Sequence, residues 1–221
     1  MWPSYVVVDK AISEELFERL KKLTFTVLES GAISTESSQS ILRMRIYTDQ
    51  STKVELEKVS SQTSILDVGL FEDIARQLAP TLLRHLLERF PFKRYLLNHI
   101  NVQLMIQPPN YVYPSHYDDA RKLASGVLYI YPQASVGTIL DRFDATGNNL
   151  EIEWRPNRFL VFCRQERVTA HSFRSNCHVR VTLVCNLMAS NKVLPLLVEG
   201  EFRLVTIVIL KAIKRLFFKL L

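Results

Sequence analysis

The second half of the chain is a series of short β-type segments, and this pattern constrains the fold more than any other feature of the sequence. Turn sequences such as TGNN and RPN separate neighbouring segments. Short strands at this spacing are typical of a β-sandwich or barrel, such as a jelly roll. The predicted strands are residues 99–107, 125–131, 136–140, 149–154, 158–163 and 178–187.

The first half has helical periodicity instead. From Glu14 to about Leu28 the apolar residues recur near every 3.6 positions, and Asp9 or Ser13 is the expected N-cap. A second helical pattern covers residues 67–90, where Pro80 predicts a kink or two helices. Strands at 5–8 and 41–48 and a polar loop at 30–40 complete this half, and residues 51–66 are ambiguous.

These patterns predict one domain over residues 1–192, with a helical N-terminal part (1–96) and a β core (97–190). The length of 221 residues and 48% hydrophobic content suit such a core. The net charge of +6 suits an acidic ligand or surface, or serves solubility, and no nucleic-acid partner is expected. Three cysteines without a framework spacing indicate reduced thiols and a cytoplasmic protein, and no signal peptide is recognisable.

Residues 193–221 differ in composition from the rest of the chain and predict a basic amphipathic C-terminal helix. The cations Lys211, Lys214, Arg215 and Lys219 interrupt an otherwise apolar run and cluster on one side at helical spacing. This helix either packs on the domain or contacts a membrane surface or a partner protein through residues 201–221. It carries too many charges to predict a membrane span.

Three residues within the β region form a candidate metal site. His116 and Asp118 stand two positions apart in PSHYDD, a spacing that on a strand turns both side chains to one face. His171 follows after several predicted strands. Two histidines and one carboxylate are the ligand set of non-haem Fe(II) sites and leave coordination positions open. Asp119 is the competing carboxylate, but it is expected on the opposite face.

An arginine nine residues beyond His171 adds a second feature. Arg180, Thr182, Val184 and Asn186 share one face of an apolar predicted strand. A charged arginine on such a strand needs a partner. An acid co-substrate bound by a bidentate pair, with Thr182 as a second donor, is one possibility, and a core Asp or Glu is the other.

The sequence resembles the 2-oxoglutarate/Fe(II)-dependent dioxygenase superfamily, in particular its prolyl-hydroxylase-like branch. The resemblance covers roughly residues 98–188 and is carried by SHYDDARKLASGVLYIYP, VGTIL, RPNRFLVFCRQERVTAHSF and CHVRVTLVCNL. It implies a double-stranded β-helix (jelly roll) with helices outside it. It also implies Fe(II) held by His116, Asp118 and His171, with 2-oxoglutarate and O₂ as co-substrates. Arg180 would bind the distal carboxylate of 2-oxoglutarate, assisted by Thr182 and Tyr129.

Two positions depart from the family pattern. Ile106 stands where many relatives have a tyrosine, and Gly137 alone remains of a common Gly-Gly pair. The function implied is hydroxylation of an unactivated C–H bond in an amino acid, a peptidyl residue or a natural-product intermediate. The alternatives are a degenerate β-barrel binding module and a cupin-like metal enzyme that does not use 2-oxoglutarate. Cations near the predicted site are expected to contact solvent or an acidic substrate group, namely Arg121, Lys122, Arg164 and Arg167.

Overall fold

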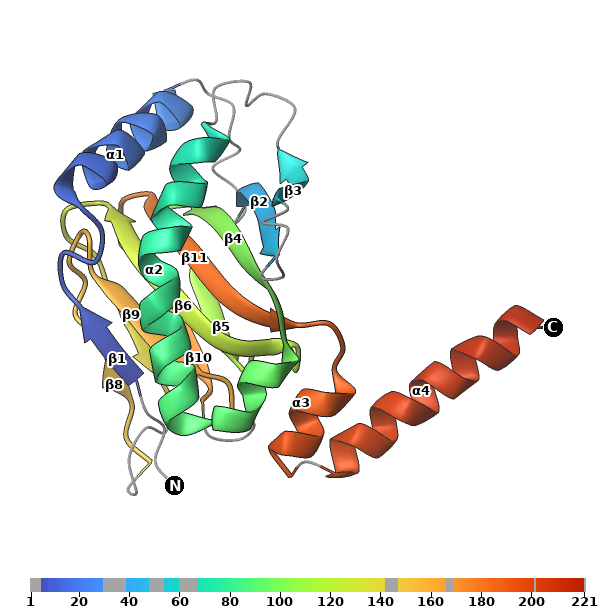
Figure 1. The fold of residues 1–221 in the computed structure, drawn as a ribbon. Coiled ribbons are helices and arrows are strands. Elements are labelled where there is room, and N and C mark those ends of the chain that lie inside the picture. Colours follow the sequence, from blue (N-terminus) through green and yellow to red (C-terminus); the bar gives the residue numbers. More distant parts are fainter. Residues whose placement is uncertain are drawn as a thin grey trace.

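The protein is built around two antiparallel β-sheets (Figure 1). A computed structural model describes residues 5–29, 39–47, 54–59, 67–141, 147–165, 169–200 and 202–220. The smaller sheet has four strands, in the order β5 (Val112–His116), β10 (His171–Arg174), β7 (Thr138–Leu140) and β8 (Leu150–Glu151). The larger has seven strands, in the order β1 (Tyr5–Val8), β9 (Phe159–Cys163), β6 (Lys122–Tyr131), β11 (Arg180–Ala189), β4 (Leu97–Gln107), β2 (Gln39–Tyr47) and β3 (Val54–Val59).

This arrangement confirms the predicted fold class, a mainly β double-stranded β-helix with flanking helices. Over the described residues the two sheets are not closed into a barrel. The central strand of the larger sheet is β11, which pairs along its whole length with β4 on one side and β6 on the other. Its side chains therefore lie alternately on the helix-covered face and on the face towards the smaller sheet.

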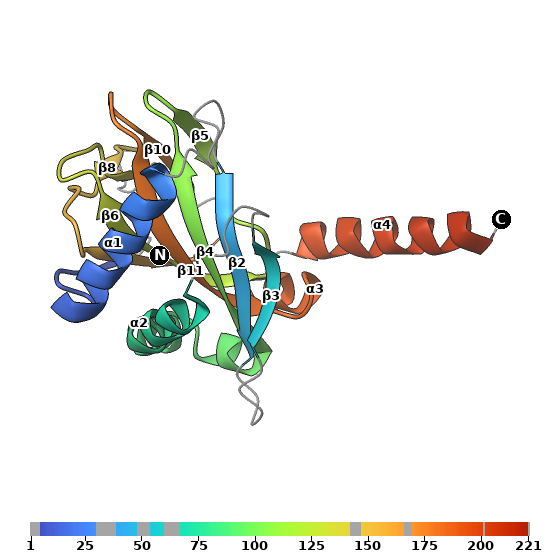
Figure 2. The ribbon, with the colours of Figure 1, turned by 90° about the horizontal axis from the view of Figure 1, so that it is seen from above.

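Two helices, α1 (Glu14–Glu29) and α2 (Val68–Arg89), cover the outer face of the larger sheet (Figures 1 and 2). Ser13 caps α1 through its hydroxyl, and Asp67 caps α2 by accepting from the backbone N–H of Leu70. The apolar positions expected to face the core in α2 are all buried: Leu70, Ile74, Leu78, Leu82 and Leu86. The helical periodicity of the sequence therefore identified the buried faces correctly.

Of the two outcomes expected at Pro80, a kink or two helices, two helices are not observed. Residues 68–89 form one helix with Pro80 inside it. Proline removes one helical hydrogen bond, but the apolar face on either side of Pro80 packs on the same sheet. Tertiary packing therefore keeps the helix continuous.

Two strands of the smaller sheet were not predicted. β5 and β10 both lie outside the predicted strands, and β10 begins at His171. Proline is tolerated in β5 because this strand is at the edge of its sheet. Most of the expected loop at 30–40, and most of the ambiguous segment at 51–66, lies outside the described residues.

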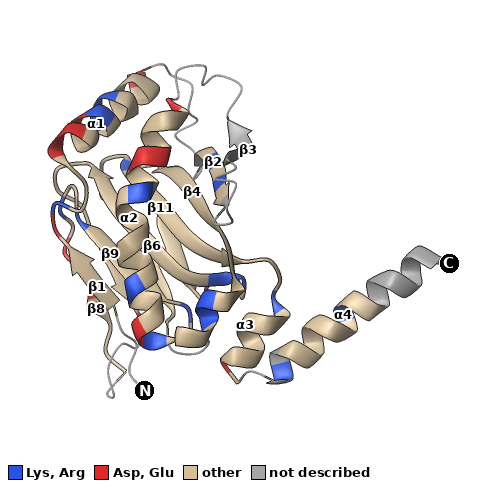
Figure 3. Cartoon of the chain, in the orientation of Figure 1, with Lys and Arg blue, Asp and Glu red and all other residues tan. Residues whose placement is uncertain are grey.

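The C-terminal residues form two helices where one was expected, α3 (Val193–Val198) and α4 (Phe202–Leu220). The helix α3 lies beside the short 3₁₀ helix η1 (Pro91–Leu96), whereas α4 extends away from the sheets (Figures 1 and 2). Both of its described charged side chains, Arg203 and Lys211, are basic (Figure 3). Within the described part of the chain, no helix is long and apolar enough to cross a membrane.

Candidate metal centre

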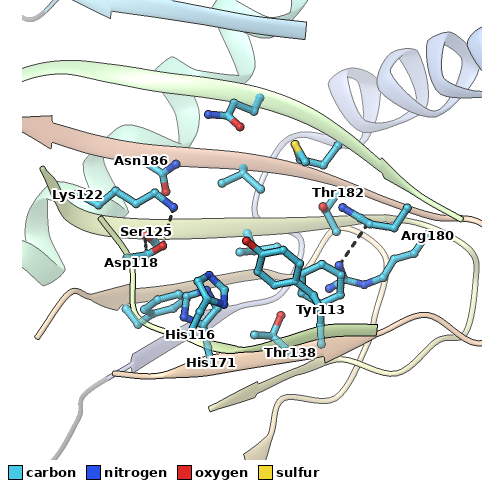
Figure 4. A pocket seen from close by; sticks show the side chains of 17 residues that line it. Tyr113, His116, Asp118, Lys122, Ser125, Thr138, His171, Arg180, Thr182 and Asn186 are labelled. Carbon is cyan, nitrogen blue, oxygen red and sulfur yellow. Dashed lines mark hydrogen bonds and ion pairs between the residues drawn. The ribbon is translucent and has the colours of Figure 1, made fainter. Parts of the chain in front are cut away.

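His116, Asp118 and His171 come together on the face of the smaller sheet (Figure 4). One ligand atom from each lies within 4.8 Å of the other two. His116 ends β5 and His171 begins β10, and the two are direct cross-strand partners with ring centroids 4.3 Å apart. The pairing of two short strands thus brings together histidines that are far apart in the sequence.

Asp118 reaches the site by a different route from the one expected. β5 ends at His116, so Asp118 belongs to the loop after the strand and not to an alternating strand pair. Its carboxylate is oriented by Lys122, whose Nζ lies 2.6 Å from Oδ1, and by Ser125, whose hydroxyl donates to Oδ2 at 2.5 Å. A carboxylate oxygen that accepts one hydrogen bond keeps a second lone pair, so both contacts are compatible with metal ligation.

The protonation states of Asp118 and His171, and the orientation of the His116 ring, suit a metal ligand set. Burial raises the pKa of the Asp118 carboxyl, but the charges of Lys122 and His171, with hydrogen bonds from Lys122 and Ser125, together outweigh burial and leave this pKa below its usual value. Burial lowers the pKa of His171 to about 4, so its ring is neutral at pH 7. His116 Nδ1 lies 3.2 Å from the carbonyl oxygen of Pro114, which can only accept, so this contact assigns Nδ1 as the donor and leaves Nε2 as the nitrogen for a metal.

The three residues open into a pocket of about 170 Å³ between the two sheets (Figure 4). The predicted face of β11 lines it with Arg180, Thr182, Val184 and Asn186. Alternate residues of β4, namely Gln103, Met105 and Gln107, lie beside them. Polar residues at every second position of an otherwise apolar strand are the signal that could have identified β4 as part of the site.

Arg180 is the most unusual residue of this pocket. It is 1% exposed, and its Nε and Nη2 are buried without a hydrogen-bond partner. Nη1 is 3.4 Å from Gln107 Oε1, and the guanidinium packs against the rings of Phe173 and Trp154. Burial lowers its pKa to about 10, so the group is still charged at pH 7.

The expected alternative of a core carboxylate is not observed, since no described Asp or Glu pairs with Arg180. Two free donors on a buried cation that lines a pocket match the requirement for an anionic ligand.

The two residues expected to assist Arg180 differ in position. Thr182 lines the pocket, but Tyr129 is fully buried and is not among the lining residues. The Tyr129 hydroxyl donates to Thr138 Oγ1 at 3.0 Å and accepts from the Thr138 backbone N–H at 3.1 Å. Its ring stacks on Trp154 and lies beside the Arg180 guanidinium.

The four cations named from the sequence have separate environments. Lys122 lines the pocket, and Arg121 pairs with Asp119 on the surface. Arg164 is 2% exposed and makes internal contacts, so the expectation that it contacts solvent or substrate is wrong. Arg167 lies outside the described residues.

Comparison with solved structures identifies the architecture. A prolyl 4-hydroxylase from Pseudomonas putida superposes with a TM-score of 0.53 at 16% identity, covering 86% of this chain and 94% of that one. The chain has the fold of the prolyl 4-hydroxylases. A prolyl hydroxylase from Trichoplax adhaerens, in complex with a hypoxia inducible factor oxygen degradation domain peptide fragment, gives a TM-score of 0.55 at 8% identity, covering 85% and 84% of the two chains.

A second prolyl 4-hydroxylase, from Phytophthora capsici, has a TM-score of 0.50 at 15% identity, covering 84% of this chain and 59% of that one. No protein-family model matches the sequence, and no curated protein matches it. The prolyl-hydroxylase likeness is therefore a likeness of fold.

Proposed function

We propose that the chain is an Fe(II)- and 2-oxoglutarate-dependent oxygenase that hydroxylates an unactivated C–H bond. His116, Asp118 and His171 would hold the metal, and Arg180 with Thr182 would hold the distal carboxylate of 2-oxoglutarate. The bound iron would supply O₂ activation coupled to oxidative decarboxylation of 2-oxoglutarate to succinate and CO₂.

The observation that carries the proposal is the pairing of two features in one pocket. A facial set of two imidazoles and one carboxylate stands between the sheets, and the buried Arg180 guanidinium lines the same space with two unsatisfied donors. A cupin-like enzyme that uses no acid co-substrate would not explain the buried guanidinium of Arg180. A degenerate binding module gives no reason for a complete ligand set.

The protein's own side chains would bind and orient the reactants. The imidazoles of His116 and His171 would offer lone pairs to the metal, and Lys122 and Ser125 hold the Asp118 carboxylate in place. The apolar walls from Val127, Phe162 and Val184 would exclude water from the reacting centre.

The substrate would be a peptidyl residue or a small molecule. The peptide bound to the Trichoplax adhaerens protein favours a peptidyl residue, and a free amino acid or another small molecule is the alternative. The aromatic pair Tyr113 and Phe173, stacked with centroids 5.1 Å apart, lines the pocket from the smaller sheet and would contact that substrate.

The helix α4 would provide a further contact, with an anionic membrane surface or a partner protein. Its sequence from Phe202 to Leu221 contains five cations and no acidic residue. Exposed apolar side chains include Ile209, Leu210 and Ile213. This combination favours an anionic lipid surface over a second copy of the same basic helix. The cytoplasmic location expected from the cysteine spacing stays a prediction.

The decisive experiment is anaerobic addition of Fe(II) and then 2-oxoglutarate to the purified chain. A visible charge-transfer band that needs both additions, and that is absent in His171→Ala and Arg180→Ala, is the expected result. Iron binding without a band would favour the cupin-like enzyme. A chain that binds no iron would favour the degenerate module.

A further inference from the structure

The loop that carries Asp118 is held by the C-terminal end of β11 and by the chain segment that follows it. We call residues 117–121 the ligand loop. The backbone N–H of Ala189 donates to the carbonyl of Arg121 at 2.7 Å, and Lys192 Nζ pairs with Asp119 Oδ2 at 2.8 Å. The ligand loop is therefore bound to residues about seventy positions later in the sequence.

Arg164 makes a third connection, which reaches the metal-ligand residue itself. This side chain is 2% exposed and follows β9. Its Nε donates to the backbone carbonyl of Asp118 at 3.0 Å, and its Nη1 pairs with Glu199. One guanidinium thus joins the ligand loop to the C-terminal end of α3.

Glu199 is itself held in place. It is the C-cap of α3, and its side chain is 1% exposed. Its second carboxylate oxygen accepts from Lys93 Nζ at 2.5 Å, and Lys93 also donates to the carbonyl of Arg164 at 3.0 Å. Buried charges are tolerated only where each is paired in good geometry, so these three residues form a unit that fixes the guanidinium of Arg164.

We propose that Arg164 is a positioning residue for the metal ligand Asp118, and that α3, through Glu199, completes the metal centre from outside the β core. This inference deepens the proposed function and rests on the metal site that it assigns. Asp118 would then be held at both ends: Arg164 fixes its backbone, while Lys122 and Ser125 fix its carboxylate.

The physical reason is the steep dependence of metal affinity on ligand geometry. Asp118 lies on a loop, so no strand pairing fixes its peptide plane. A charge-assisted hydrogen bond to its carbonyl, from a guanidinium anchored at its other end, restricts rotation of that plane. Loss of residues that orient ligands typically weakens metal binding about 10–100-fold.

The test is titration of the full-length chain with Co(II), followed by its absorption bands, on matched variants. Arg164→Lys keeps a cation beside Glu199 but removes the Nε donor, and it is expected to weaken Co(II) binding about tenfold or more. Glu199→Gln removes the carboxylate charge that pairs with Arg164 Nη1, and it is also expected to weaken Co(II) binding. Each variant is also unfolded with urea, so that affinity is compared among folded proteins.

Arg158→Lys is the matched control. Arg158 is also a buried arginine beside β9, but it pairs with Asp9 at 2.6 Å and with Glu153, away from the ligand loop. This control is expected to lose stability and to bind Co(II) like the wild type. Equal weakening in Arg158→Lys would overturn the positioning role, because the effect would then follow general stability.

The outcomes separate the two proposals. A wild-type chain that binds no Co(II) would overturn the proposed function. Wild-type binding together with equally tight binding in Arg164→Lys and Glu199→Gln would overturn the positioning role alone.

A second readout follows from linkage. If α3 completes the metal centre, Co(II) must stabilise α3 in return, so amide exchange over residues 193–200 should slow on adding Co(II). Glu199→Gln should remove this slowing. If adding Co(II) to the wild type leaves the amide exchange rates in α3 unchanged, the proposal is contradicted.

Discussion

Arg180 shows how a residue can be costly for the fold and necessary for the site. A buried guanidinium with two unpaired nitrogens destabilises the ligand-free protein, because its donors have lost water and gained nothing. The surrounding rings of Phe173, Trp154 and Tyr129 offset part of this cost. A ligand carboxylate would supply the missing acceptors.

We therefore expect Arg180→Met to raise the ligand-free stability by about 1–3 kcal/mol, because an apolar side chain removes the unpaired charge. The same change should abolish the rise in melting temperature that 2-oxoglutarate gives in the presence of Mn(II). Thermal unfolding with and without 2-oxoglutarate measures both effects. Arg158→Met is the control and should destabilise, because it removes the ion pairs that the buried Arg158 makes with Asp9 and Glu153. A less stable Arg180→Met protein would contradict this account.

Tyr129 allows a separate test of a role implied by the family resemblance. Tyr129→Phe leaves the buried backbone N–H of Thr138 without its acceptor, so we expect a loss of about 1–3 kcal/mol in unfolding free energy. Because the hydroxyl is committed to Thr138, 2-oxoglutarate affinity should change little. Urea unfolding and 2-oxoglutarate titration check the two expectations. A tenfold weaker affinity at unchanged stability would establish a direct contact with the co-substrate instead.

The pKa of His171 predicts how stability depends on pH. Its folded-state pKa is about 4, below the ordinary value of 6.5, because the ring is buried. Between these values the unfolded chain binds a proton that the folded chain does not, so stability falls as pH falls from 6.5 towards 4. We expect the metal-free protein to lose about 3 kcal/mol across this window. Urea unfolding at several pH values should show the loss in the wild type and a shallower slope in His171→Gln; equal slopes would contradict the assignment.

At the residue level, the sequence predicted which side chains share the pocket face better than it predicted contacts between residues far apart in the chain. The alternation along β11 predicted that Arg180, Thr182 and Asn186 share one face, and this face lines the pocket. Arg164 was misassigned because its partners, Glu199 and the Asp118 carbonyl, are distant in sequence, and no local pattern marks them. Ion pairs between segments that are far apart in the sequence form only when the whole chain is packed, so a local sequence pattern does not predict them.

At the level of elements, periodicity identified the long helices and strands but not the short strands beside the metal site. The face of α2 was predictable because its apolar residues recur every three or four positions over 22 residues. β5 (VYPSH) contains a proline and β10 (HSFR) has no β-branched residue, so neither is strand-like in sequence, and their pairing creates the strand conformation. The sequence named the three candidate ligand residues that the structure brings together, but not the strand pairing that does so.

The intact helix around Pro80 leads to a prediction about α2. Pro80 is exposed within the helix and cannot donate to the carbonyl of Arg76. Pro80→Ala restores that donor and relieves the ring clash, so we expect a gain of about 1–3 kcal/mol in unfolding free energy. Urea unfolding measures it, with Glu88→Ala on the same helix as a control that should change stability by less than about 0.5 kcal/mol. An unchanged or lower stability would mean that the helix depends on a bend at Pro80.

At the scale of the whole molecule, the chain combines a sheet core with a C-terminal extension that faces outward. The core buries its apolar residues between the larger sheet and the helices α1 and α2. In α4 the described residue Val205 is buried, whereas Ile207, Ile209, Leu210 and Ile213 are exposed. Exposed apolar residues at this density on one helix indicate a contact surface.

We expect the full-length chain to co-sediment with vesicles containing anionic lipid, and less so as salt rises, because apolar insertion and cation attraction act together. Lys211→Glu reverses one charge on α4 and should weaken binding about tenfold, since each cation near such a surface contributes about 1 kcal/mol. Lys22→Glu makes the same charge change on α1, away from α4, and should leave binding unchanged.

The two variants separate the possible roles of α4. Equal weakening by Lys22→Glu and Lys211→Glu would mean that net charge, not the helix, drives adsorption. A chain that does not bind vesicles but sediments as a larger species at higher protein concentration would mean that the apolar side chains of α4 bind a second copy.

Because α4 is joined to α3, and Glu199 of α3 contacts Arg164, surface binding that tightens Co(II) affinity would make the helix part of the metal centre's regulation.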